Sequence, residues 1–577
     1  MKIYWQILKK YTSSLILCPL LVLIFVICET TMPTLMAKIV DEGVMQKDLQ
    51  VVTRIGLYML AISAVGLLAN IANIYISSRA SVGFGTDLRS KLFGKVQEFS
   101  FSEIDKFNPA SLITRLTGDI TRIQQVLQIS LRLLLRAPLM MAMALFFVIR
   151  IDSRLALIVA AVIPILAIGT YIIMKRGLPL FLKVQQKIDK LNSVVRENLI
   201  NIRVVKSFTR EESEIGKFSK SNEELRDTSI RASNVVIIYF PLMQSIMNLS
   251  LIVILWVGGH KIASEELMIG ELISLINYLM QIMMSLMILS MVIVSFARAA
   301  ASSQRIVEVL ETDPSVKDEP ERYPMALHNH SSEKNKILFR NVHFRYPQGD
   351  EDILQDISLS IPKGSIVAIA GATGSGKSSL VQLIPRLYDI TKGEISIDGH
   401  DIRSYPLDEL HKMVGMVLQK NELFSGTIEE NLRWGKEDAT TEEIEKAAEI
   451  AQAHNFITSF KDGYKTILGR GGINVSGGQK QRICIARALL RQPEILILDD
   501  STSAVDINTE MEILDGLRAN LKGTTILIVT QRISTMERAD TIVILEDGKI
   551  EAIGNPKEIK ERSPIYKEIC SSQQLTV

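Results

Sequence analysis

The sequence predicts a multidomain protein with two parts, an all-α membrane domain followed by an α/β domain. The N-terminal half contains six apolar runs that are long enough to cross a bilayer. Hydrophobic residues make up 47% of the chain and the mean hydropathy is +0.22, which is high for a soluble protein. Strands and helices alternate in the C-terminal part, and a chain of 577 residues is too long for a single compact core.

The six apolar runs are expected to be transmembrane helices, because a helix needs about 20 apolar residues to cross a bilayer. The first run lacks a small-residue cleavage site and is followed by further spans, so we expect a retained helix rather than a signal peptide. An even number of spans leaves both termini on one side of the membrane. We place the spans at residues 15–36, 55–76, 133–150, 154–174, 234–258 and 272–296.

Charge in the connections predicts which side this is. The two long connections, 77–132 and 175–233, are rich in Lys and Arg, whereas the other connections are short and poorer in them. By the positive-inside tendency, we expect the long connections, both termini and the α/β domain to be cytoplasmic. The segment LNSVVRENLINIRVVKSF repeats apolar residues at three- and four-residue steps, which predicts membrane helices that continue into the cytoplasm.

Two features inside the spans have both a functional and a structural explanation. Glu29 is a carboxylate at the end of an apolar run, which makes it a candidate functional group, although a place at the outer mouth or in a water-filled cavity explains it equally well. Methionine clusters suit varied apolar ligands, but helix packing or lipid contact explains them more often. The clusters are Met140, Met141 and Met143, and Met280, Met283, Met284, Met287 and Met291.

The composition excludes several other classes of protein. A formal net charge of +2 and a pI of about 8.1 give no basic surplus for binding nucleic acid. The four cysteines are scattered without a CxxC pair, which indicates neither a zinc site nor a disulfide framework. The HNH sequence at residues 328–330 lies in a polar linker, where a chance occurrence explains it better than a metal site.

A glycine-rich turn in the C-terminal part predicts a phosphate-binding loop. The segment SIVAIAGATGSGKSSLVQLI is typical of a strand, a turn and a helix. Backbone N–H groups of such a loop surround phosphates, Lys377 reaches the β- and γ-phosphates, and Ser378 binds magnesium. The helix N-terminus adds its dipole. The nucleotide contacts are expected from Gly371, Ala372, Thr373, Gly374, Ser375, Gly376, Lys377, Ser378 and Ser379.

Two further motifs complete the prediction of a nucleotide site. The strand EILILDD brings Asp499 to the same end of a parallel sheet, where it holds magnesium. Ser476, Gly477, Gly478 and Gln479 open a long helix and form a second potential phosphate site. One γ-phosphate cannot reach both sites if they lie on opposite edges of the domain. We therefore expect a dimer in which each nucleotide lies between one chain's P-loop and the other chain's Ser-Gly-Gly-Gln segment.

In this order, the motifs resemble those of ATP-binding cassette (ABC) exporters of the half-transporter type over essentially the full chain. The resemblance implies a six-span domain at residues 1–310, a linker at 311–336 and an ABC nucleotide-binding domain at 337–577. It also implies ATP and Mg²⁺ as ligands, an ATPase coupled to transport, and insertion in the plasma (inner) membrane with contact to lipid and to a hydrophobic or amphipathic substrate.

The resemblance implies roles for residues that no single motif assigns. Tyr346 matches the aromatic residue that stacks on adenine, and Gln419 matches the glutamine that joins Ser378 and Asp499 at magnesium. Coupling segments lie near residues 107–119 and 200–212. The remaining matches are Ser476–Gln479 as the signature, Ser503 and Asp506 in the dimer-contact loop, Gln531 at the switch position, and Val205 and Phe208 as docking residues for coupling.

Two positions depart from the family pattern. Hydrolytically strong members carry Glu, the general base, where this chain has Asp500, and carry His where it has Gln531. An aspartate oxygen falls short by about 1 Å, a shift that can lower a rate by about a hundredfold. Glutamine donates a hydrogen bond but cannot carry the charge of a protonated imidazole. These changes predict a site that binds ATP firmly and hydrolyses it slowly.

The signature VSGGQKQR is intact apart from Val475 in place of Leu. This contrast predicts the degenerate-site subunit of a heterodimeric bacterial multidrug-type exporter. The partner half-transporter is then expected to carry Glu and His at the positions of Asp500 and Gln531. A further departure is Arg470, which stands where the family has an acidic residue that contacts the partner's coupling helix.

Other functions were compared with this prediction. A soluble cassette ATPase of DNA repair or translation is excluded by the six spans, and fusion with the spans first favours an exporter over an importer. A homodimeric lipid or peptide exporter with weak ATPase activity remains an alternative, as does an ATP-gated channel or regulatory subunit. For the cargo, lipids, drugs, peptides and lipid-linked sugars all fit, and the Met-rich spans favour amphipathic drug-like compounds.

Overall fold

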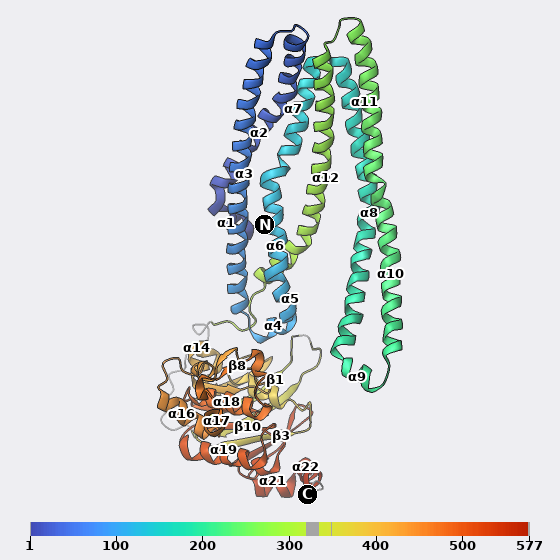
Figure 1. The fold of residues 1–577 in the computed structure, drawn as a ribbon. Coiled ribbons are helices and arrows are strands. Elements are labelled where there is room, and N and C mark those ends of the chain that lie inside the picture. The colour runs from blue at the N-terminus through green and yellow to red at the C-terminus, as the bar shows by residue number, and fades with distance from the viewer. Residues whose placement is uncertain (1, 319–333, 348, 575–577) are drawn as a thin grey trace. The chain divides into compact units, whose positions relative to one another are not determined.

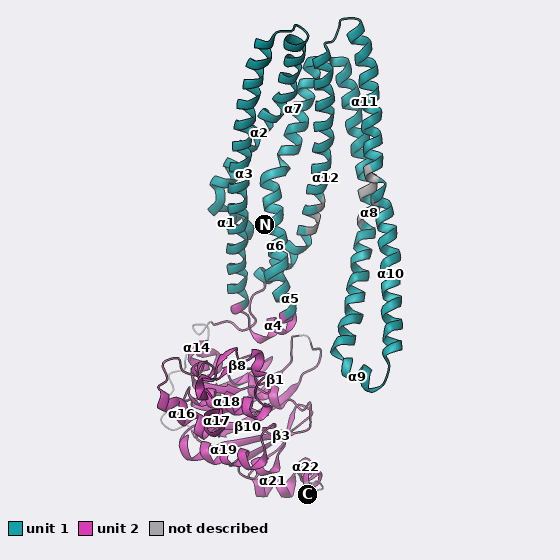
Figure 2. Cartoon of the chain, viewed as in Figure 1, with its two compact units in different colours: residues 1–96, 110–311 teal, residues 97–109, 312–577 magenta. Residues whose placement is uncertain are grey.

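The computed structural model describes residues 2–318, 334–347 and 349–574, and divides the chain into two compact units (Figure 2). The helical unit comprises residues 1–96 and 110–311, and the α/β unit comprises residues 97–109 and 312–577. The short segment 97–109 therefore belongs with the C-terminal unit although it interrupts the N-terminal one. The HNH sequence and most of the expected linker lie outside the described residues.

The helical unit is built from long helices (Figure 1). Six stretches among the described residues are long and apolar enough to cross a membrane. They are Ile3–Val44, Leu49–Gln97, Pro109–Ile151, Ser153–Ile200, Pro241–Ala263 and Ile269–Ile293. Four predicted spans lie inside these stretches and the last two overlap them. The fifth prediction begins too early, since residues 234–237 still belong to the preceding helix, which ends at Ile237.

The helices pack along their lengths. Helices α2, α7 and α12 contact one another, and α8 runs beside α10 (Figure 1). Asp152 caps α8 by accepting hydrogen bonds from the N–H groups of Arg154 and Leu155, and it pairs with Lys261. The helices are α1 Lys2–Leu8, α2 Thr12–Lys38, α3 Leu49–Gln97, α4 Phe101–Phe107, α5 Pro109–Thr114, α6 Ile120–Ile129, α7 Arg136–Ile151, α8 Ser153–Ile200, α9 Ile202–Ser207, α10 Glu211–Ile237, α11 Tyr239–Ala263 and α12 Ile269–Glu311.

The α/β unit contains a six-stranded sheet in the order β12-β11-β3-β10-β9-β6, in which only β12 is antiparallel to its neighbour. A four-stranded antiparallel sheet has the order β2-β1-β4-β5. The principal strands are β1 Asn335–Phe344, β2 Leu354–Pro362, β3 Ile366–Gly371, β4 Lys392–Ile397, β5 His400–Asp401, β6 Val414–Val417, β9 Ile495–Asp499, β10 Thr525–Val529, β11 Thr541–Glu546 and β12 Lys549–Gly554; β7 Gly426–Thr427 and β8 Ile467–Leu468 form a short ribbon.

The central strands are apolar throughout because both faces of their sheet are covered. Along β3, Ala368 and Ala370 join one hydrophobic core, while Val367 and Ile369 join the other. The helices that follow are α13 Lys377–Leu383, α14 Leu407–Met413, α15 Ile428–Arg433, α16 Thr441–Ile450, α17 His454–Ser459, α18 Gly477–Leu489, α19 Ile507–Asn520, α20 Ile533–Met536, α21 Pro556–Arg562 and α22 Pro564–Gln574. The predicted fold class, a helical membrane domain followed by an α/β domain, is confirmed.

A buried lysine joins the two sheets. The side chain of Lys336 in β1 is 1% exposed, and its Nζ donates to Asp398 Oδ2 at 2.5 Å and to Glu494. Asp398 follows β4 and Glu494 precedes β9, so these bonds tie the antiparallel sheet to the parallel one. The carboxylates retain contact with water, because their side chains are 34% and 57% exposed.

We expect the two halves of this interaction to respond differently to substitution. Replacing both acids, in Asp398→Asn with Glu494→Gln, leaves a buried ammonium unpaired and should cost about 3–5 kcal/mol of stability. Lys336→Met should cost less, since the carboxylates that remain can be hydrated. Thermal unfolding of the purified chain in detergent measures the difference. A larger fall in melting temperature for Lys336→Met would contradict this account.

Candidate nucleotide-binding site

The candidate site lies where three neighbouring parallel strands end. In the order β3-β10-β9, these strands carry Gly371, Val529 and Asp499 at their carboxyl ends. The carboxyl edge of an open parallel sheet is where such folds bind ligands. The next strand, β6, ends at Val417, two residues before Gln419. The sheet order thus brings together four segments that lie up to about 160 residues apart in the sequence.

A pocket of about 500 Å³ occupies this edge. It includes ten of the residues predicted for the nucleotide site, together with three that no motif indicated. The lining residues are Tyr346, Thr373, Gly374, Gly376, Lys377, Ser378, Ser379, Gln419, Asp500 and Gln531 from the prediction, and Ile353, Val529 and Thr530 in addition. Gly371, Ala372 and Ser375 belong to the same loop but are not among the lining residues.

The loop geometry requires glycine at its two ends. A Cβ on Gly371 would approach the carbonyl oxygen of Leu545 to 2.1 Å, and the residue has a φ of 145°. Gly376, with a φ of 94°, stands directly before α13. Lys377 Nζ donates to the carbonyl oxygens of Gly371 at 3.0 Å and Ala372 at 2.6 Å, so its ammonium lies over the loop. Burial lowers the pKa of Lys377.

Two of the three residues predicted to hold magnesium, Ser378 and Asp499, are adjacent and chemically suited to it, whereas Gln419 bonds to Asp500. Ser378 Oγ donates to Asp499 Oδ1 at 2.8 Å. Asp499 is fully buried, and its Oδ2 has no hydrogen-bond partner among the residues that the structure describes. Burial raises the pKa of this carboxyl group. A buried carboxylate oxygen with unused acceptor capacity beside a hydroxyl is the donor set that Mg²⁺ prefers, so these residues fit the ion.

Asp500 has an unusual backbone conformation for a residue with a side chain. Its φ is 48°, and its N–H donates to the carbonyl oxygen of Val529 at 3.1 Å, which joins the end of β9 to the end of β10. Burial raises the pKa of Asp500, whereas a hydrogen bond from Gln419 lowers it in part. Asp500 and Gln531 both line the pocket that holds Lys377.

The signature segment lies outside this pocket. Ser476 caps α18, since its Oγ accepts from the Gln479 N–H at 3.3 Å while Gln479 Oε1 accepts from the Ser476 N–H at 2.9 Å. None of the described residues that line the pocket comes from Ser476–Gln479. Asp506 in the dimer-contact loop caps α19 by accepting from the Thr509 N–H at 3.0 Å.

Comparison with known proteins supports the same assignment for the whole chain. The ABC transporter transmembrane region matches residues 15–286, and the ABC transporter domain matches residues 354–503. An uncharacterized ABC transporter ATP-binding protein of Bacillus subtilis, YfiB, is 40% identical over 566 residues, which cover 98% of this chain and 97% of the relative. The chain belongs to the ABC transporter family.

The fold matches that of an ABC exporter. The structure of a bacterial Atm1-family ABC exporter with ATP bound aligns with a TM-score of 0.81 and 25% identity, covering 98% of each chain. The ATP-dependent lipid A-core flippase of Desulfotalea psychrophila is 32% identical over 539 residues, 93% of each chain. The predicted half-transporter architecture, with a multi-pass membrane domain fused to an ABC ATPase domain, is confirmed. Such a domain implies ATP hydrolysis coupled to transport.

The short helix α4 belongs to the α/β unit, although it lies in the N-terminal part of the sequence. It stands slightly before the predicted coupling segment 107–119. Asp105 of α4 accepts a hydrogen bond from Tyr388 Oη at 2.7 Å, and Phe101 lies 6.0 Å from the Tyr388 ring. Tyr388 in turn meets Tyr346 edge-on at 5.2 Å, and Tyr346 Oη bonds Ser379 Oγ at 2.9 Å. A continuous set of contacts thus leads from α4 to the expected adenine platform.

The second predicted coupling segment contains α9. Phe208 directly after it is 72% exposed, and Val205 is half-buried. In the membrane domain, Glu29 is half-buried and interacts electrostatically with Arg136. Met140 is buried among Val22 and Val26. Met280, Met284 and Met291 are exposed on α12, while Met141, Met143, Met283 and Met287 are half-buried.

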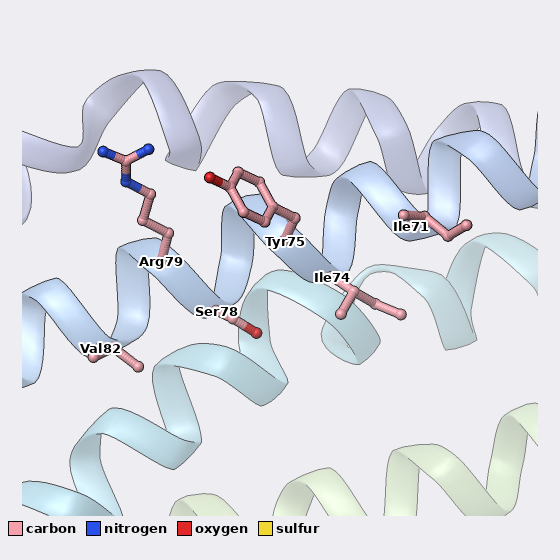
Figure 3. Close-up of a pocket in the computed structure, with 6 residues that line it drawn as sticks. All are labelled: Ile71, Ile74, Tyr75, Ser78, Arg79 and Val82. Atoms are coloured by element: carbon pink, nitrogen blue, oxygen red, sulfur yellow. The ribbon is translucent and has the colours of Figure 1, made fainter.

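An open hollow on α3 differs from the nucleotide pocket in its chemistry. Figure 3 shows Ile71, Ile74, Tyr75, Ser78, Arg79 and Val82, all from this one helix. The Arg79 and Tyr75 side chains extend to the same side of the helix (Figure 3). One cation and a phenol beside aliphatic side chains make a surface that suits an amphipathic molecule.

Sequence motifs did not indicate three residues that hold the site's segments together. Gln481 of α18 accepts from the Ala504 N–H at 3.0 Å, which fixes the dimer-contact loop to the signature helix. Glu510 is fully buried and pairs with Arg532, the residue after Gln531. In the sequence, Glu510 and Gln481 are recognisable only as an acid and an amide on the apolar faces of amphipathic helices. This pattern does not predict which residues they contact.

We expect Asp105 and Tyr388 to act as one unit. Tyr388→Phe and Asp105→Asn each remove a hydrogen bond to a charged group, worth about 1.5–3 kcal/mol. Each should lower cargo stimulation of ATPase activity, and the double variant should be no worse than the singles. Tyr405→Phe removes a buried hydrogen bond to Ile397 elsewhere in the domain and serves as the control. Losses that add would show that the two side chains act separately.

Proposed function

We propose that this chain is one half of a heterodimeric ABC exporter that moves amphipathic or hydrophobic compounds, drug-like or lipid-like, out of the cytoplasm. Its own P-loop site binds ATP with Mg²⁺ but hydrolyses it slowly. Its signature completes the competent site of a partner half-transporter. The observation that carries the proposal is the presence of Asp500 and Gln531 in one pocket with Lys377.

The slow chemistry follows from the two side chains nearest to the expected γ-phosphate. Asp500 keeps a carboxylate, and burial makes it more basic, but its oxygen reaches about 1 Å less far than that of a glutamate. The backbone cannot readily compensate, because Asp500 is fixed through its N–H to Val529. Gln531 can donate to a phosphate oxygen without adding positive charge there. The residues that bind ATP are therefore retained, while Asp500 and Gln531 activate the attacking water less effectively.

The need for a partner follows from the position of the signature. Ser476–Gln479 offers a helix N-terminus outside the chain's own pocket, so it suits the nucleotide of a second chain. Exposed apolar residues on the ABC domain also suit a partner. Phe424 and Trp434 stack at 4.1 Å and are 48% and 66% exposed. Val205 and Phe208 are proposed to dock on the corresponding surface of the partner. The partner's coupling segment would then meet this chain's apolar surface beside the exposed Arg470.

The proposed cycle uses these contacts for alternating access. Two ATP molecules join the two ABC domains, and closure reaches the membrane helices through α4 and α9. Hydrolysis at the competent site then separates the domains. The termini and the ABC domain are on the cytoplasmic side in this proposal. For the cargo, the hollow with Arg79 and the exposed methionines of α12 favour an amphipathic compound. One Bacillus subtilis relative is provisionally named for multidrug export.

Restoring the family residues should accelerate the chain's own site. Asp500→Glu lengthens the carboxylate arm and Gln531→His restores a group that can carry charge. We expect the combined variant to raise single-turnover ATP hydrolysis at this P-loop by about tenfold to a hundredfold. The control is Lys377→Ala in the same background, which should abolish the gain. An unchanged rate in the combined variant would remove the basis for a degenerate site.

The two half-sites of the assembled heterodimer should differ in importance. Lys377→Ala disables the slow site and should leave about half or more of the steady-state ATPase activity, because the partner's site carries most of the turnover. Gly477→Asp places an acid on the partner's γ-phosphate and should abolish most activity. The fold tolerates this change, since a Cβ on Gly477 meets only the Ala504 Cβ at 3.4 Å. Equal losses would indicate a homodimer with equivalent sites.

A further inference from the structure

The last helix of the chain contacts the switch segment directly. Gln573, near the end of α22, uses both ends of its side-chain amide. Its Nε2 donates to the carbonyl oxygen of Gln531 at 2.6 Å, and its Oε1 accepts from the N–H of Ile533 at 3.2 Å. The two backbone groups flank Arg532, so one amide side chain spans the residue that follows the pocket-lining Gln531.

Helix α22 is anchored well enough for this contact to constrain the segment. Tyr566 is fully buried in the hydrophobic core of the ABC domain, and Ile569 packs against the same core. Ser563 is fully buried, accepts from the Tyr566 N–H at 3.2 Å and donates to Glu551 at 2.7 Å. Figure 1 shows α22 next to the C-terminal end of the drawn chain. The amide of Gln573 is thus presented from a helix that is fixed two turns earlier.

The side chain of Arg532 is held independently of this backbone contact. Its Nη2 donates to the carbonyl oxygen of Ser503 at 2.9 Å, and its Nη1 pairs with buried Glu510. Glu510 also accepts from Thr502 at 2.7 Å and Thr535 at 2.8 Å. These contacts set where Arg532 points, whereas the peptide groups on either side of it are held by Gln573. Both are needed to fix the direction in which residue 531 leaves the strand.

We infer that Gln573 is a positioning residue for ATP hydrolysis, which holds the backbone so that the side chain of residue 531 faces the γ-phosphate. ATP affinity depends on the P-loop and the adenine platform, which Gln573 does not touch. Turnover depends on residue 531 and therefore on this clamp. The inference concerns the same pocket as the proposed slow site but does not rest on that site being slow.

Gln573→Met is the sharpest variant, because it keeps the length and helix propensity of the side chain and removes both hydrogen bonds. With the full chain in its assembled transporter, we expect the turnover of this P-loop site (kcat, taken from single-turnover hydrolysis) to fall about fivefold with its affinity for ATP unchanged, as for the loss of two neutral hydrogen bonds. Ser571→Ala is the matched control on α22, since among the described residues Ser571 Oγ bonds the carbonyl of Glu568, one turn back in the same helix. It should behave as wild type.

A second measurement keeps this test separate from that of the slow site. Hydrogen exchange of the peptide spanning residues 530–536 should accelerate in Gln573→Met but not in Ser571→Ala. The ratio of kcat between Gln573→Met and its parent is measured twice, once in the wild-type background and once in the Asp500→Glu/Gln531→His background. The ratio can be determined whether or not the second background hydrolyses ATP faster. Unchanged exchange would overturn the clamp. Faster exchange with unchanged kcat would overturn its role in positioning residue 531.

Discussion

The order of three parallel strands is the constraint on which the site depends. Strand β10 lies between β3 and β9, so the switch segment leaves the sheet between the P-loop and the magnesium aspartate. Register fixes this arrangement, because Val529 pairs with both Ile369 and Asp499. The apolar residues of these strands are covered on both faces, and a slip by one residue would exchange the two cores. The chemistry at the edge is therefore set by packing well inside the domain.

The buried carboxylate of Glu510 links the segments that follow these strands. Glu510 lies in α19, and its three side-chain partners are Thr502 before the dimer-contact loop, Arg532 in the switch segment and Thr535 after it. An isolated carboxylate in this environment would be strongly unfavourable, so its hydrogen bonds and ion pair are mutually required. The consequence is that the switch segment and the dimer-contact loop cannot move independently. A displacement of one of them is therefore passed directly to the other.

The sequence allowed most of the architecture to be predicted because the relevant signals are local. Apolar runs of bilayer length marked the six spans, and the glycine-rich turn with Lys377 and Ser378 marked the pocket. The boundary between α10 and α11 was misplaced, since the apolar stretch at 234–237 continues across the break. The α4 contact with Tyr388, the Glu510 pair and the Gln573 clamp join residues that are 283, 22 and 42 positions apart. No periodicity or spacing encodes such pairs; they follow only from the folded order of the strands.

The pocket and the signature segment are constrained differently by the fold. This difference affects which residues can change when the two halves of a transporter diverge in sequence. Residues proposed to bind phosphate in this pocket are constrained by the loop backbone, as the close approach of Gly371 to Leu545 shows. Asp500 and Gln531 are under a weaker constraint, since both line the pocket and neither belongs to a hydrophobic core. The signature is different again, because Ser476 and Gln479 cap each other and Gly478 stands against the Ala504 carbonyl. Substitution of Ser476, Gly478 or Gln479 would disturb the helix and the dimer-contact loop together, whereas Gly477 leaves room for a side chain. In the proposed heterodimer, a chain can thus lose hydrolysis in its own pocket by changes at two side chains, while its fold still requires the half-site that it offers to the partner.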